Sequence, residues 1–114
     1  MTLSERIEAA EGPSRELDWL IAEALGWTRR QVGQVIAYYA PGDGIMRAGP
    51  PKWTASLDAA MSLVPEGWRT SISNTTGLGW FVLVCEYGRF GEAYAKATTP
   101  ALALAAAALK ARGL

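Results

Sequence analysis

The chain of 114 residues contains no histidine and a single cysteine, Cys85. The absence of histidine excludes Ser-His and Cys-His nucleophile pairs, the commonest general base and the commonest zinc ligand. One cysteine cannot form an intramolecular disulfide, which fits a reducing compartment. Cys85 lies in an apolar run, so we expect a buried, unreactive thiol. These absences predict a protein that is not an enzyme and that needs no metal or other cofactor.

An excess of charge of one sign is also lacking, since 11 Lys and Arg balance 11 Asp and Glu. Nucleic-acid affinity depends on basic residues that neutralise phosphates, so this balance argues against a nucleic-acid partner. The closest approach to a membrane-spanning segment, Ala101–Leu109, is far shorter than the roughly 18 apolar residues required. Residues Met1–Glu8 do not have the basic start and apolar run of a signal peptide. We therefore expect a cytoplasmic protein with no membrane partner.

Two helices are predicted in the first 26 residues. Apolar residues recur at helical spacing through Leu3–Leu25, and Gly12-Pro13 interrupts them because proline lacks a backbone donor. Ser14 is suited to cap the second helix, and Gly26 is suited to end it. We expect the acidic Asp18 on a solvated face of this helix.

The segment Trp27–Trp53 is harder to assign. Thr28 and Gln31 have the spacing of a capping box, and apolar residues follow on one helical face, which predicts a short helix over Arg29–Tyr39. A strand is the alternative, because Val35–Tyr39 is rich in β-forming residues. Proline and glycine then mark turns and a loop at Pro41–Gly44, Ile45–Lys52 and Gly49–Pro51.

The remaining residues, 54–114, predict a helix, three strands and a helix. Thr54 or Ser56 can cap the first helix, which is expected to end at Val64. Thr99 caps the last helix and is followed by proline at the first helical position, where its missing donor has no cost. The predicted strands and turns are Trp68–Ser73, Asn74–Gly79, Trp80–Cys85, Tyr87–Gly91 and Glu92–Ala97.

Together these elements predict a single α+β domain over residues 1–114, with the order α-α-β-β-β-α. We expect a three-stranded antiparallel meander with Trp80–Cys85 as the central strand. That strand is apolar at every position, which indicates cover on both faces, and the helix Ser14–Leu25 is the expected second cover. The result is a three-layer α/β/α sandwich, divided into N-terminal helices (1–26), a variable segment (27–53) and an α-β-β-β-α unit (54–114).

Three motifs carry a family resemblance: Trp53–Ala60 (WTASLDAA), Leu63–Trp68 (LVPEGW) and Thr99–Leu104 (TPALAL). In combination they resemble small phage and prophage proteins with a phage α-β-α sandwich domain. The resemblance covers residues 17–25 and most of 53–112. It implies a phage-encoded accessory protein of unknown function, and it supplies no catalytic residues.

The element order from Thr54 onward is also that of a double-stranded-RNA-binding domain. That family contacts phosphates through lysines at the start of its last helix. Here these positions are Thr99–Leu102, without lysine, so the likeness argues against RNA binding by this surface.

Aromatic and basic residues in and beside the variable segment are the candidate binding residues. Aromatic side chains next to arginines are typical of stacking sites and of protein interfaces. Arg29 and Arg30 could form a basic rim with Arg47 and Lys52. The alternatives are that the two arginines are merely solvated, and that Trp27 and Trp53 pin the segment to the domain. Trp19, Trp68 and Trp80 are expected in the core. The candidates are Trp27, Arg29, Arg30, Tyr38, Tyr39, Arg47 and Trp53.

Two functions follow as hypotheses. The first is a phage accessory protein that binds a host or phage protein, such as a component of a host defence system, which it would inhibit. The second is a small-ligand protein that sequesters a nucleotide signal between the subunits of a homo-oligomer, since aromatic rings and arginines suit a base and its phosphates.

Overall fold

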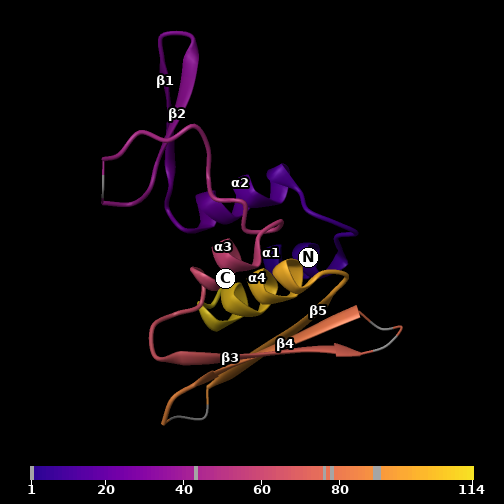
Figure 1. The fold of residues 1–114 in the computed structure, drawn as a ribbon. Coiled ribbons are helices and arrows are strands. Elements are labelled where there is room, and N and C mark those ends of the chain that lie inside the picture. Colours follow the sequence, from indigo (N-terminus) through magenta and orange to yellow (C-terminus); the bar gives the residue numbers. More distant parts are fainter. Residues whose placement is uncertain (1, 43, 76, 78, 89–90) are drawn as a thin grey trace.

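The computed structural model describes residues 2–42, 44–75, 77, 79–88 and 91–114, and within them the chain is an α+β fold (Figure 1). The predicted turns Asn74–Gly79 and Tyr87–Gly91 lie partly outside the described residues. In chain order the elements are α1 (Leu3–Ala9), α2 (Arg15–Ala24), β1 (Thr28–Val32), β2 (Val35–Tyr39), α3 (Leu57–Met61), β3 (Trp68–Thr75), β4 (Gly79–Glu86), β5 (Glu92–Ala97) and α4 (Pro100–Ala111).

The two N-terminal helices are confirmed, with the break where Gly12-Pro13 predicted it. The Ser14 hydroxyl accepts a hydrogen bond from the Leu17 N–H at 3.2 Å, which satisfies one of the free donors at the start of α2. After α2 the chain turns at Gly26, whose φ of +89° favours a residue without a Cβ. Local signals were therefore sufficient to place both helices.

The three-stranded antiparallel meander is also confirmed, with the order β3-β4-β5. In the register, Val82 of β4 lies between Ile72 of β3 and Ala95 of β5. Helix α4 packs against β4 and β5, and the alanines of β5 allow the helix to lie close to the sheet. Leu102 and Leu104 of α4 are fully buried, and each contributes about 2 kcal/mol through removal of apolar surface from water.

The predicted three-layer sandwich is not confirmed, because Figure 1 shows α1, α2, α3 and α4 on one side of this sheet. Helices α1 and α3 pack beside α4, and α2 lies beyond them. The outward face of the sheet carries Tyr94, which is 58% exposed, and the partly buried Phe81, Leu83 and Cys85. The centroids of the Phe81 and Tyr94 rings are 5.9 Å apart, so Tyr94 of β5 covers part of Phe81 of β4 on the face away from the helices. Cys85 is accordingly only partly buried, not fully buried as predicted.

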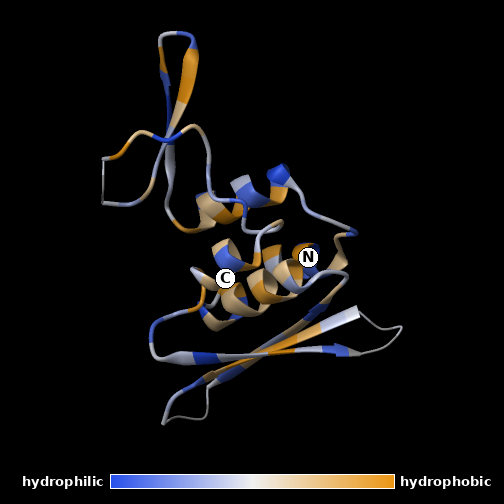
Figure 2. Ribbon diagram, viewed as in Figure 1, coloured by the Kyte–Doolittle hydropathy of each residue, from blue (hydrophilic) through white to orange (hydrophobic). Residues whose placement is uncertain are grey.

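The predicted helix Arg29–Tyr39 is wrong, and the alternative of a strand is correct. Strands β1 and β2 form an antiparallel hairpin in which Val32 pairs with Val35 across the turn Gly33-Gln34. Gly33 has φ +65° at the first central position, where type II′ hairpin turns place glycine. The hairpin projects away from the helices and the larger sheet (Figure 1), and Figure 2 shows hydrophobic residues along it.

Helix α3 is shorter than the predicted helix and begins after Ser56, which accepts from the Ala59 N–H at 3.3 Å. Of the two predicted caps, Ser56 is therefore the one used. Thr54 instead belongs to a buried polar cluster beneath α2. The helix ends at Met61, before the expected Val64.

Candidate functional site

The base of the hairpin is built from three of the predicted site residues, Trp27, Arg47 and Trp53. The Trp27 and Trp53 rings meet edge to face, with centroids 5.9 Å apart and planes at 89°. The guanidinium carbon of Arg47 lies 5.3 Å from the Trp27 ring centroid, a cation–π distance. Trp53 is 3% exposed and belongs to the hydrophobic core, so this pair attaches both ends of the variable segment to the domain.

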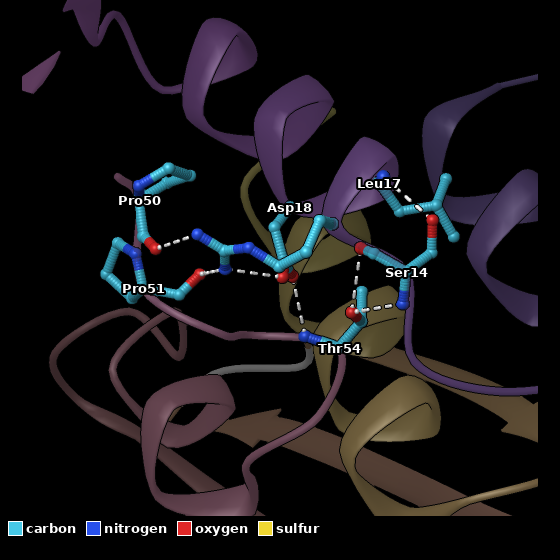
Figure 3. Close-up of polar contacts among 7 residues, drawn as sticks. Ser14, Leu17, Asp18, Pro50, Pro51 and Thr54 are labelled. Atoms are coloured by element: carbon cyan, nitrogen blue, oxygen red, sulfur yellow. Dashed lines mark hydrogen bonds and ion pairs between the residues drawn. The ribbon is translucent and has the colours of Figure 1, made fainter. Parts of the chain in front are cut away.

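A buried hydrogen-bond cluster strengthens the same attachment (Figure 3). Asp18 of α2 accepts from the Thr54 backbone N–H at 2.8 Å, and both residues are fully buried. The Thr54 hydroxyl donates to the Ser14 carbonyl at 3.0 Å and accepts from the Ser14 N–H at 2.9 Å. The prediction that Asp18 faces solvent is therefore wrong, because its partner lies 36 residues away in the sequence.

Arg15 extends this cluster to the loop before Trp53. Its guanidinium donates to Asp18 Oδ2 at 2.9 Å and to the Pro50 carbonyl at 3.0 Å. A Cβ at Gly49 would lie 2.9 Å from an Arg15 nitrogen, so glycine leaves the guanidinium room there. The loop that returns from the hairpin is thus tied to the first turn of α2, a connection that no local sequence signal indicated.

The two arginines of β1 face opposite sides of the hairpin, since successive residues of a strand alternate. Arg29 lines a pocket of about 180 Å³ with Trp19, Trp27 and Tyr38. The Trp19 and Tyr38 rings are 6.0 Å apart, and Trp19 is 43% exposed. The prediction that Trp19 is a core residue is therefore wrong, whereas Trp68 and Trp80 pack partly buried against the core.

Arg30 lines a second pocket, of about 380 Å³, on the other face of the hairpin. Tyr39 and Thr28 lie in the same pocket, because they pair across the hairpin and share the Arg30 face. Arg29 and Arg30 thus serve two pockets instead of one basic rim. Among the residues that the structure describes, neither arginine forms an ion pair with a carboxylate.

The tip of the hairpin carries exposed aliphatic side chains that the sequence interpretation had assigned to a helix face. Val32 is 50%, Val35 is 63% and Ile36 is 47% exposed. Ile45 and Met46, in the loop that follows β2, are also exposed. The signal that could have located this surface was Gly33-Gln34, a two-residue hairpin turn between two β-branched valines.

Comparisons with protein-family models, with curated proteins and with solved structures found no match for this chain. Over the described ranges, no helix has the length and apolar character needed to cross a membrane. In the same part of the chain, no group of three or more Cys, Asp or Glu residues is placed to hold a metal ion.

Proposed function

We propose that this chain is a non-enzymatic, phage-encoded accessory protein that binds a host or phage protein through the tip of its β1-β2 hairpin. The observation that carries the proposal is the pair of exposed valines, Val32 and Val35, on one face of a projecting arm, with the exposed Ile36 on its other face. The phage origin, the cytoplasm of the host cell as its location, and a defence component as the partner rest on the family resemblance of the three sequence motifs.

The rest of the fold does little to stabilise the tip of the hairpin. An isolated two-stranded hairpin is marginally stable in water, and this one is supported at its base, where Tyr38 pairs with Arg47 and contacts Trp19. Val32 and Val35 lie at the far end, beyond these contacts. Apolar side chains that do not stabilise the fold, grouped beside arginines, are typical of protein interaction surfaces.

Site-specific photo-crosslinking tests this proposal. Benzoylphenylalanine is placed at position 35 or, as a matched control, at position 87, because Val35 and Tyr87 are both 63% exposed. After irradiation in host cells, we expect a defined adduct with another protein from position 35 and none from position 87. Adding Val32→Asp to the position-35 variant should remove the adduct, because Val32 pairs with position 35 on the same face of the hairpin and a carboxylate cannot enter an apolar interface without cost.

Two results would contradict the proposal. One is the same set of adducts from positions 35 and 87, which would indicate nonspecific encounters. The other is an adduct between two copies of this chain and with no other protein, which would assign the tip to self-association.

The second candidate function is sequestration of a nucleotide by a homo-oligomer. Arg30 favours it, since this arginine lines a pocket with Tyr39 and has no carboxylate partner among the described residues. Trp27 is less suited to stacking than its sequence context suggested, because Arg47 and Trp53 already contact its ring. Light scattering at several protein concentrations tests the oligomer, and a monomer at all of them would exclude a site between subunits.

A further inference from the structure

The pocket on the Arg30 face of the hairpin combines hydrogen-bond donors with open backbone. Thr28 and Arg30 come from β1, and Tyr39 comes from the end of β2. Ala40, Gly42 and Gly44 of the following loop complete the lining. A Cβ built on Gly42 or Gly44 would meet nothing within 4 Å, so a ligand can approach the backbone there.

The charge of this region is positive and partly uncompensated. The segment 27–53 has Arg29, Arg30, Arg47 and Lys52 against one acidic residue, Asp43. Arg47 lies on the Trp27 ring, while Arg30 has no carboxylate partner among the described residues. A guanidinium presents planar, paired donors that match the oxygens of a phosphate group.

From this arrangement we infer that the pocket binds the phosphate group of a small phosphorylated ligand. Arg30 donates to two phosphate oxygens, and the hydroxyls of Thr28 and Tyr39 supply further donors from the same side. The site lies on the base half of the hairpin and does not include the aliphatic tip. It therefore does not depend on the proposed protein partner, and its test stands apart from the crosslinking experiment.

Isothermal titration calorimetry with inorganic phosphate, adenosine monophosphate and adenosine tests the inference. We expect the unmodified chain to bind the first two and not adenosine, because the phosphate is the recognised group. Arg30→Gln should weaken binding by about ten-fold or more, the usual value of hydrogen bonds to a charged group. Arg29→Gln is the matched control: it makes the same charge change on the neighbouring residue, on the opposite face, and should alter affinity less than about two-fold.

Further measurements distinguish free phosphate from a nucleotide as the ligand and check that each variant is folded. Equal affinity for phosphate and adenosine monophosphate assigns recognition to the phosphate alone, and tighter binding of the nucleotide adds a contact with the nucleoside; both results support the site. Arg30→Lys, which keeps the charge but loses the paired donors, should recover part of the affinity. Near-ultraviolet circular dichroism checks that each variant keeps its tertiary structure.

The inference would be overturned by any of three results. The first is no heat from phosphate or adenosine monophosphate at millimolar concentrations. The second is equal weakening by Arg29→Gln and Arg30→Gln, which indicates a diffuse charge effect. The third is binding of adenosine as tight as that of its monophosphate.

Discussion

The Thr54 backbone N–H donates to Asp18 Oδ1 at 2.8 Å, and neither residue is exposed to solvent. This bond joins the first turn of α2 to the end of the variable segment. Trp27, which follows α2, and Trp53, the residue before Thr54, make a second connection between the same two segments. These two connections therefore close the base of the projecting hairpin. They explain how a two-stranded element of marginal stability is held at a defined position.

Replacement of Asp18 should destabilise the whole domain. Asp18→Ala leaves a buried N–H of Thr54 without an acceptor and removes the Arg15 partner, so we expect a loss of about 3 kcal/mol in the free energy of unfolding. Asp18→Asn keeps an oxygen for Thr54, and we expect a loss of about 1 kcal/mol. Urea denaturation followed by tryptophan fluorescence measures both values.

The exposed Glu23, on the same helix, supplies the control for this pair. Glu23→Gln should change stability by less than about 0.5 kcal/mol, as surface substitutions usually do. Equal losses for Asp18→Ala and Asp18→Asn would contradict the role of Oδ1 as an acceptor.

Gly79, at the start of β4, should be intolerant of any side chain. Its φ is +88°, and a Cβ there would lie 2.7 Å from the Ala97 carbonyl oxygen. Gly67 has a similar φ, +85°, but open space around the added carbon. Thermal unfolding should show that Gly67→Ala costs about 1 kcal/mol from backbone strain alone. Gly79→Ala should cost about 3 kcal/mol, because overpacking adds to the strain. Similar losses in both variants would show that the edge of β5 can move aside.

Alkylation of Cys85 tests whether one face of the sheet is free of helices. Cys85 is partly exposed on the outward face, so iodoacetamide should modify the native protein within about ten-fold of the rate for the unfolded chain. The control is Val84→Cys in a Cys85→Ser background, because Val84 is fully buried beneath α4 and its replacement should be strongly protected. Equal, strong protection at both positions would mean that another layer covers the outward face.

The hairpin tip should contribute nothing to stability. Val35→Lys and Ile36→Lys replace exposed side chains, and each should shift the free energy of unfolding by less than about 0.5 kcal/mol. Differential scanning calorimetry provides the comparison with the unmodified chain. A loss well above that size would assign these residues a structural role and would remove the reason for placing a binding surface there.

The sequence analysis took its candidate site residues from the segment 27–53, but it did not predict how they are arranged. Trp27, Arg47 and Trp53 do lie together. Arg29 and Arg30 are adjacent in sequence, yet they line different pockets, because the segment is a strand and not a helix. A helix has about 3.6 residues per turn, so the side chains of adjacent residues point about 100° apart. On a helix, Arg29 and Arg30 would therefore not lie on opposite faces.

By itself the sequence determined the features that depend on neighbouring residues. The cap at Ser14, the break at Gly12-Pro13 and the alternation of Glu92–Ala97 all appear where they were predicted, since each reflects hydrogen bonds or backbone angles within a few residues. Only the tertiary structure decided the hairpin, the position of α2 and the burial of Asp18. The valines around Gly33 fit a helix or a hairpin, and pairing across strands selects between them. Asp18 is buried because its partner, Thr54, arrives from far along the chain.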